Sequence, residues 1–224
     1  MRRYIMDKLY GAKFAIVTFD DTSKIMAPFT MDTNLIGESI DILNVSNYVY
    51  AKGTSLNKPI ENMRSVFMAS EKNSNRARIV FFISDGEITN NDELNKSGYS
   101  DLKQYISDGA VLGYGTTTGG YMYVNDLYDD SYTYVEDKSS YPYTKAISRI
   151  DEVNLETIAN SLGVDYIYMD NQANIDSKLE EILNGVEYKA SKVDLSSYED
   201  IYYMFVIPLV GLLGYEFITF RRFS

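Results

Sequence analysis

Two residue types that carry much of enzyme chemistry are missing from this chain of 224 residues, which contains no histidine and no cysteine. Without them the protein cannot form a Ser-His-Asp or Cys-His catalytic group, a thiolate zinc site or a disulfide. Any metal ion must therefore be held by oxygen ligands, which favours magnesium, calcium or manganese.

Basic residues are scarce relative to acidic ones, with 21 Lys and Arg against 32 Asp and Glu and a formal net charge of −11. Tracking a phosphate backbone requires a basic patch, so we do not expect a nucleic-acid partner. The acidic balance suits cations and basic protein surfaces, and it also serves solubility. The apolar fraction of 45% and the charged fraction of 24% are those of an ordinary folded protein.

A long apolar run lies near the C-terminal end, at residues 201–220, IYYMFVIPLVGLLGYEFITF, with Glu216 as its one ionisable group. Such a run is about as long as the ~20 residues that cross a bilayer core. Two tyrosines near its start suit an interfacial aromatic belt, and Arg221 and Arg222 follow as a cytoplasmic anchor. We predict a single transmembrane helix in the cell membrane; the alternative is a buried core helix that ends the fold.

The predicted organisation places most of the chain outside the cytoplasm. An extracytoplasmic folded domain is expected at residues 1–187, a tether at 188–200, the membrane span at 201–220 and a cytoplasmic tail at 221–224. Within the domain, strand patterns alternate with helix patterns, which predicts an α/β fold with a doubly wound, mostly parallel sheet. Strands are expected at residues 13–19, 24–26, 79–84, 110–115 and 164–169, and helices at 35–43, 56–67, 102–106, 155–162 and 175–186. Residues 1–10 are typical of the end of an amphipathic helix.

A tyrosine-rich insertion interrupts this alternation at residues 121–145, where there are seven tyrosines and five acidic residues. A hairpin with an exposed aromatic face fits the pattern, and it is interpreted either as a solvated insertion or as a recognition loop. The candidate partner-binding residues are Glu87, Tyr121, Tyr123, Tyr132 and Tyr134.

Two short motifs stand beside predicted elements: Lys-Gly-Thr-Ser-Leu at 52–56, before a helix, and Ser-Asp-Gly-Glu at 84–87, after a strand. A hydroxyl at a helix start and a carboxylate at a neighbouring strand end can share one hard cation. Each motif also has an ordinary interpretation, because Thr54 or Ser55 is a normal helix N-cap and Asp-Gly is a common turn.

Together, and in this order, the two motifs resemble the von Willebrand factor A (VWA) domain, in which such segments supply two parts of a metal-ion-dependent adhesion site (MIDAS). The segment 148–169, SRIDEVNLETIANSLGVDYIYM, and the apolar run look like the membrane-anchored bacterial members of the aerotolerance (Bat) type. The resemblance implies that Thr54 binds Mg²⁺ (or Mn²⁺ or Ca²⁺) through its hydroxyl, with Ser55 as a further candidate, and that Asp85 binds it directly or through water. It implies a protein ligand on the outer face that donates a carboxylate, and it suggests a partner ATPase of the MoxR type.

One part of the family pattern is missing. The first motif, Asp-x-Ser-x-Ser, ends a strand that is central in the family's sheet order 3-2-1-4-5-6, between the strands expected here at 13–19 and 79–84. Asp20-Asp21-Thr22-Ser23 has similar residue types but follows the wrong strand. We therefore interpret the sequence as N-terminally truncated within the domain, and we expect weak metal binding. Without the central strand, two strand edges are either exposed or paired directly.

The predicted function is that of a membrane-tethered protein-binding module with an incomplete metal site, not an enzyme. The first alternative is a magnesium-dependent phosphotransfer or hydrolase domain with Asp85 as nucleophile or ligand and Asp20 and Asp21 as companions. Against it, no lysine follows the later strands and no phosphate-binding glycine motif is found. The second alternative is a structural subunit of a membrane complex with a vestigial metal site.

Overall fold

The computed structural model describes residues 5–6, 8–9, 11–44, 52–70, 76–90, 92–125, 132–137, 141–170 and 172–190. The chain divides into two compact units, Met1–Val186 and Glu187–Ser224. Of the second unit only residues 187–190, the end of a helix, are described, so the predicted membrane span at 201–220 and most of the tether lie outside the described residues. No helix among those that are described is both long enough and apolar enough to cross a membrane.

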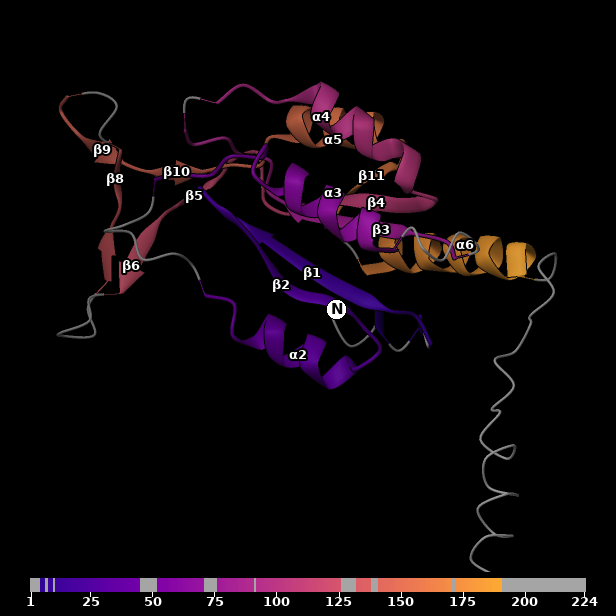
Figure 1. Ribbon diagram of the computed structural model, residues 1–224. Helices are drawn as coiled ribbons and strands as arrows, with labels where there is room; N and C mark the ends of the chain where they lie inside the picture. The colour runs from indigo at the N-terminus through magenta and orange to yellow at the C-terminus, as the bar shows by residue number, and fades with distance from the viewer. Residues whose placement is uncertain are drawn as a thin grey trace, which may run out of the picture. The chain divides into compact units, whose positions relative to one another are not determined.

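A parallel three-stranded sheet forms the centre of the first unit (Figure 1). Its strands are β3 (Ile79–Ser84), β4 (Asp108–Gly113) and β11 (Asp165–Tyr168), with β4 in the middle. Phe82 lies opposite Val111, and Leu112 lies opposite Ile167. The run of buried residues in β4 fits its central place, because such a parallel strand is covered on both faces. In β3, at the edge of this sheet, Ile83 remains 51% exposed.

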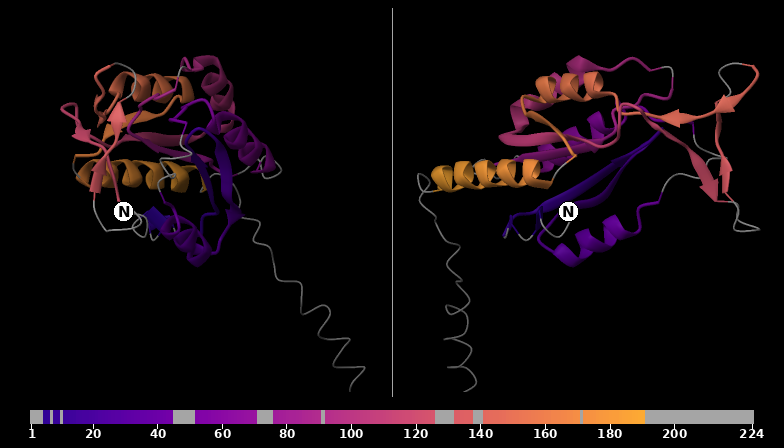
Figure 2. Two further views of the ribbon diagram at one scale, coloured as in Figure 1. Left: turned by 90° about the vertical axis from the view of Figure 1, so that its left-hand side faces the viewer. Right: turned by 180° about the vertical axis from the view of Figure 1, so that it is seen from behind.

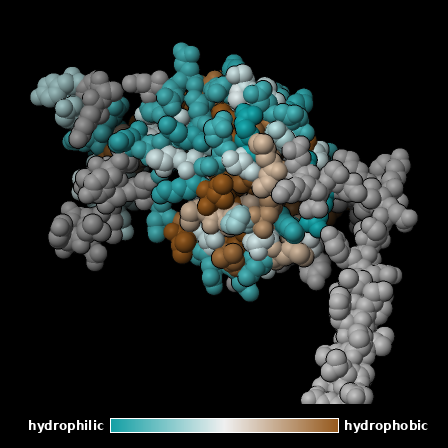
Figure 3. Space-filling model, viewed as in Figure 1, coloured by the Kyte–Doolittle hydropathy of each residue, from teal (hydrophilic) through white to brown (hydrophobic). Residues whose placement is uncertain are grey.

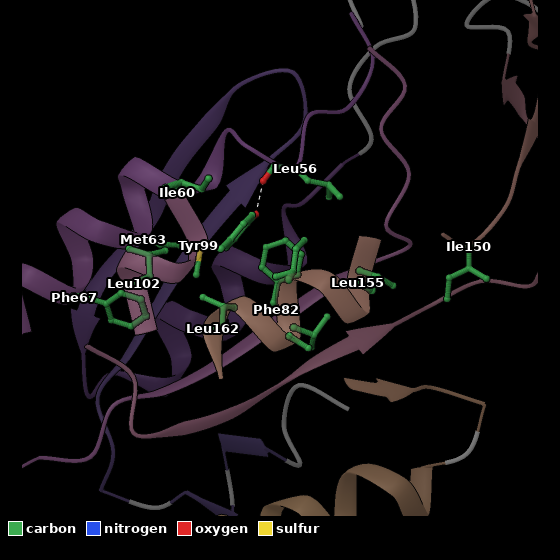
Figure 4. Close-up of a cluster of buried hydrophobic side chains, with 13 residues drawn as sticks. Leu56, Ile60, Met63, Phe67, Phe82, Tyr99, Leu102, Ile150, Leu155 and Leu162 are labelled. Atoms are coloured by element: carbon green, nitrogen blue, oxygen red, sulfur yellow. Dashed lines mark hydrogen bonds between the residues drawn. The ribbon is translucent and has the colours of Figure 1, made fainter. Parts of the chain in front are cut away.

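Helices cover both faces of this sheet (Figures 1 and 2). The side chains of α3, α4 and α5 share one cluster with Phe82 and Val111 (Figure 4), in which the Tyr99 hydroxyl donates a hydrogen bond to the Leu56 carbonyl. On the other face α6 packs against Ala110 and Leu112. The bounds are α3 Pro59–Ser70, α4 Lys96–Leu102, the short 3₁₀ helix η1 Lys103–Tyr105, α5 Glu152–Leu162 and α6 Gln172–Ala190. Ile5 and Leu9 also pack against the α6 cluster, in line with the predicted N-terminal helix.

A separate antiparallel pair, β1 (Phe14–Phe19) and β2 (Ser23–Thr30), lies beside this sheet, with α2 (Thr33–Asp41) and α3 packed against it. Phe19 of β1 stacks on Phe82 of β3 with ring centroids 5.2 Å apart. In the described part of the chain, β1 pairs only with β2 and β3 pairs only with β4. Of the two outcomes expected without the central strand, direct pairing of β1 with β3 is not seen. The sheet is split between them, because no described strand lies there to share their hydrogen bonds.

The tyrosine-rich insertion forms three short antiparallel ladders that stand clear of the helices (Figure 1). They are β5 (Gly120–Tyr121) with β10 (Ile147–Ser148), β6 (Tyr123–Asn125) with β7 (Tyr132–Tyr134), and β8 (Glu136–Asp137) with β9 (Thr144–Lys145). The ladders meet at a ring of three backbone hydrogen bonds, in which Met122 donates to Ala146 (3.0 Å), Ala146 to Val135 (2.8 Å) and Val135 to Met122 (2.9 Å). The β6–β7 pair is the hairpin that the sequence predicts, and the other two ladders are additional.

Candidate functional site

The two motifs singled out in the sequence are brought together at the carboxyl end of β3. The Thr54 amide donates to the Thr89 hydroxyl (2.7 Å), and the Thr89 amide donates to the Thr54 carbonyl (3.1 Å). Gly53, with φ of 90°, allows this close approach, because a Cβ there would lie 2.8 Å from the Thr89 carbonyl oxygen. The Gly-Thr-Ser loop therefore lies directly against the loop that Asp85 begins.

The Ser55 side chain is held in place by a hydrogen bond within the protein. Its side chain is fully buried, and its hydroxyl donates to the Asp92 carboxylate at 2.5 Å. This hydrogen bond, with a second from Asn90, lowers the pKa of Asp92. The Ser55 amide donates to the Asp20 carbonyl (3.0 Å), which joins the loop after β1 to the same site. Of the two predicted hydroxyl ligands, the half-buried Thr54 is the one whose hydroxyl is not committed to Asp92.

Asp85 lies half-buried in the turn that follows β3. Burial raises the pKa of its carboxyl group, the hydrogen bond from the Glu87 amide (3.1 Å) opposes this shift, and the nearby Glu87 charge adds to it. A bound divalent cation would offset both the burial and the repulsion, because its charge is the largest in such a site. A cation bound beside Asp85 would therefore favour the ionised form of its carboxyl group.

The turn containing Asp85 is fixed against the start of α5. The Asp151 amide donates to the Asp85 carbonyl (2.8 Å), and the Asn154 side-chain amide donates to the Gly86 carbonyl (3.0 Å). Asp151 is also the N-cap of α5 and accepts a hydrogen bond from the Asn154 amide (3.0 Å). The position of Asp85 therefore depends on a helix cap more than sixty residues further along the chain.

Glu87, predicted to contact a partner, links this site to the tyrosine-rich insertion. Its carboxylate accepts hydrogen bonds from the Ser148 hydroxyl (2.8 Å) and the Arg149 amide (2.7 Å) at the end of β10. An open cleft of about 470 Å³ lies beside it, between residues 87–89 and the start of α5. Glu87 thus holds the end of β10 against the loop that follows β3.

The described residues supply only part of the ligands that a metal site would need. Thr54 and Asp85 offer a hydroxyl and a carboxylate, which are donors of the kind that Mg²⁺, Mn²⁺ and Ca²⁺ prefer. No group of three or more acidic side chains that could hold an ion is found within the described ranges. Since these ions take about six oxygen ligands, the remaining ones would have to come from water, from another segment or from a partner.

The four predicted tyrosines lie together in one cluster, hereafter the tyrosine cluster. Tyr121 and Tyr134 pack edge to face with ring centroids 5.7 Å apart, and Tyr123 packs in the same way on Tyr132 at 5.5 Å and on Tyr134 at 6.5 Å. The Lys145 ammonium lies 3.6 Å from the ring centroid of Tyr134 and 5.4 Å from that of Tyr121. All four tyrosines are exposed.

Sequence reasoning missed the residues that position the site, namely Thr89, Asp92, Ser148 and Asn154. Thr89 and Asp92 stand in the polar loop after β3, where nothing in the local pattern separates them from ordinary loop residues. Ser148 and Asn154 act across 61 and 68 positions of the chain. Asp-Glu-Val-Asn at 151–154, a cap signal before an apolar helix, was the one available sign.

Comparison with known proteins finds one family model that matches part of the chain. Residues 2–87 match the family model of the von Willebrand factor type A domain, a range that contains Thr54, Asp85 and Glu87. The mixed α/β fold with its parallel sheet is VWA-like, as the sequence predicts.

Solved structures extend the likeness to most of the chain. A conserved hypothetical protein, BatB from Bacteroides thetaiotaomicron, matches with a TM-score of 0.64 and 18% identity, over 85% of this chain and 86% of its own. An aerotolerance-related membrane protein from Bacteroides fragilis matches with a TM-score of 0.56 and 18% identity, over 86% of this chain and 87% of its own. At this identity the likeness concerns the fold. A search of curated proteins found no match.

Proposed function

We propose that this protein is a VWA-type protein-binding module, tethered to the cell membrane by residues 201–220 with its folded part on the outer face. One observation carries the proposal: the hydrogen bonds between Thr54 and Thr89 join the Gly-Thr-Ser loop to the Asp85 loop. They do so at the carboxyl end of a parallel strand, which is where open α/β sheets bind their ligands.

In this proposal Thr54 and Asp85 hold Mg²⁺, or Mn²⁺ or Ca²⁺, and a carboxylate of a protein ligand completes its coordination. The ion would make an acidic partner compatible with a chain of net charge −11, since it places a positive charge between the two surfaces. The split between β1 and β3 supports a further source of ligands: a strand placed there would end near the loops that follow both strands, at Asp20 and Asp85. If that strand ended in Asp-x-Ser-x-Ser, its side chains would supply the further metal ligands.

Membrane tethering rests on the apolar run and on the two arginines that follow it. The similar protein from Bacteroides fragilis is described as a membrane protein, which agrees with a membrane location. A MoxR-type ATPase is proposed as a partner on the basis of the Bat-like resemblance, and its retention on the immobilised chain would test that proposal.

The metal site is tested by calorimetric titration of the full chain with Mg²⁺ in detergent micelles. We expect no saturable site at millimolar Mg²⁺, because two protein oxygens are too few to replace the ion's tightly held water. Adding a synthetic apolar strand that ends in Asp-x-Ser-x-Ser should create a site that Thr54→Ala and Asp85→Ala abolish. Asp101→Asn, at an exposed acid in α4, should leave it intact. A tight site in the chain alone, or one that survives both alanine variants, would contradict the proposal.

A binding module should show no turnover, so ATPase and phosphatase assays of the full chain should give no activity above that of an Asp85→Ala variant. Activity lost on that substitution would favour the phosphotransfer alternative. If both alanine variants capture the protein ligand as well as the wild type does, the metal site is vestigial and the structural-subunit alternative holds.

A further inference from the structure

The tyrosine cluster is a preformed aromatic surface. Its members come from paired strands, with Tyr123 directly opposite Tyr134 in the β6–β7 register, and their rings meet at angles between 76° and 88°. Edge-to-face contacts of this kind restrict the rings while leaving much of their area in solvent, where the exposed fractions run from 45% to 68%. Rigid, exposed tyrosines supply contact area at a low cost in conformational entropy.

The cluster already holds a cation from its own chain. The Lys145 ammonium lies within the roughly 6 Å range of a cation–π contact from two ring centroids, those of Tyr134 and Tyr121. Lys145 lies opposite Glu136 in the β8–β9 ladder, so an acidic residue accompanies the rings. Residues 121–145 carry five acidic residues and two lysines, so the insertion, like the whole chain, has a net negative charge. Ring faces and charge therefore both favour a positively charged ligand.

We propose that the tyrosine cluster is a recognition surface for an arginine-bearing segment of a partner protein, and that Lys145 occupies the cation position when no partner is bound. Arginine suits it better than lysine, because a guanidinium is planar, more weakly hydrated and stacks on aromatic faces. The proposal concerns a second surface and does not depend on the metal site, since it recognises a cation where that site recognises a carboxylate.

A carbohydrate is the main competing ligand for exposed aromatic rings, and the geometry disfavours it. Sugar rings stack on flat, open aromatic faces, whereas these four rings stand nearly perpendicular to their neighbours. The ammonium of Lys145 covers one face of Tyr134.

The test is calorimetric titration of the full chain in detergent micelles with a hexa-arginine amide peptide. Tyr121→Leu and Tyr134→Leu should each weaken binding about two- to fivefold, the range of an exposed cation–π contact. Tyr141→Leu, at a tyrosine that is 89% exposed and lies outside the Lys145 contacts, is the control and should not change it. These three substitutions leave net charge unchanged, so equal losses in all three would overturn the proposal.

Substitution of Lys145 gives a change in the opposite direction. Lys145→Met frees the cation position and should tighten hexa-arginine binding about two- to fivefold beyond Lys24→Met, which makes the same charge change at an exposed lysine of β2. Equal effects of the two substitutions would show that the peptide senses only net charge and would overturn the proposal. So would hexa-lysine binding as tight as that of hexa-arginine, or binding of cellohexaose that the Tyr134 substitution removes. EDTA should leave peptide binding unchanged, because the tyrosine cluster does not use a metal ion. This control separates the result from any effect of the metal site.

Discussion

Gly86 shows how tightly the turn after β3 is packed against α5. Its φ is 80°, a left-handed conformation, and a Cβ at this position would collide with the Asp151 carbonyl oxygen and lie 2.8 Å from Cγ of Leu155. Both partners are fixed, one as backbone at a helix cap and the other as a fully buried core side chain. The residue beside Asp85 therefore has to be glycine.

Gly86→Ala should lower the free energy of unfolding by roughly 2–4 kcal/mol, from left-handed strain together with overpacking. Gly37→Ala is a matched control, because Gly37 lies in α2 with no heavy atom within 4 Å of its would-be Cβ. That change should stabilise the protein by about 0.5–1 kcal/mol through helix propensity. Denaturant unfolding followed by circular dichroism measures both, and a Gly86→Ala midpoint equal to that of the wild type would contradict the account.

Ionisation of Asp85 costs folding free energy, because burial raises the pKa of its carboxyl group in the folded state. The folded state therefore binds this proton more tightly than the unfolded state does, and stability falls as the pH rises from 3.8 through the raised pKa. Asp85→Asn cannot ionise and should unfold at a higher midpoint than the wild type at pH 7, with the difference vanishing below pH 3.8. Asp101→Asn makes the same charge change at an exposed acid of α4 and is the control. A parallel pH dependence for Asp85→Asn would show that the carboxyl group carries no such penalty.

The elements of the α/β body were predictable because each has a long periodic signal. Leu155, Ile158 and Leu162 indicate a helix ended by Gly163, and α5 ends there, with Gly163 in the left-handed conformation. Boundaries were less well predicted: β4 begins at Asp108, two residues early, because Asp108 and Gly109 pair with the first residues of β3. The two-residue ladders of the insertion, β5–β10 and β8–β9, have no periodicity that could predict them, so only tertiary hydrogen bonds reveal them.

The residues of the candidate site also differ in how far the sequence could predict them. That the Thr54 loop and the Asp85 loop lie together was predictable, because each stands next to a strongly patterned element. The roles of Ser55 and Glu87 were not, because they depend on Asp92 and Ser148, 37 and 61 positions away. A hydroxyl or carboxylate that is committed to a structural hydrogen bond has the same sequence signature as a free ligand.

Helix α6 is fixed to the sheet by one buried cation. The Lys178 ammonium contacts Asp165 (2.7 Å), Asp108 (3.0 Å) and Glu181 (3.2 Å), and its side chain is only 7% exposed. Burial alone would lower the pKa of Lys178, but the hydrogen bonds that its ammonium donates to Asp165, Asp108 and Glu181 raise it above the usual value. The ion cluster joins α6 to the first residues of β4 and β11.

Lys178→Met should therefore destabilise the protein by about 2 kcal/mol, since it removes the charged hydrogen bonds of a buried ammonium and leaves the partly buried Asp108 carboxylate without its cation. Lys24→Met, at an exposed lysine, should change stability by less than about 0.5 kcal/mol. Denaturant midpoints of the two variants give the comparison, and equal midpoints would show that the cluster contributes nothing beyond net charge. The wild-type stabilisation from Lys178 should be lost only in strong alkali, above the ordinary lysine pKa of 10.5.

The surface of the first unit is uneven in polarity. Figure 3 shows hydrophobic side chains gathered over the region of β1 and α2, among otherwise hydrophilic residues. The exposed apolar residues of β2, α2 and the residues directly after them are Ile25, Phe29, Met31, Leu35, Ile42 and Leu43. They lie on the side of the split where the described residues form the two-stranded β1–β2 sheet. Composition predicts an acidic protein, but it says nothing about where its apolar surface remains open.

The split between β1 and β3 also determines how the protein can open. Cooperativity normally spreads across a sheet through backbone hydrogen bonds, and in the described residues those bonds stop on either side of the split. The two sides are coupled instead through side chains, such as the stacked rings of Phe19 and Phe82, and through α3. We therefore expect the β1–β2 pair with α2 to be a separate unit of local unfolding, which detaches at a lower free energy than the parallel sheet does.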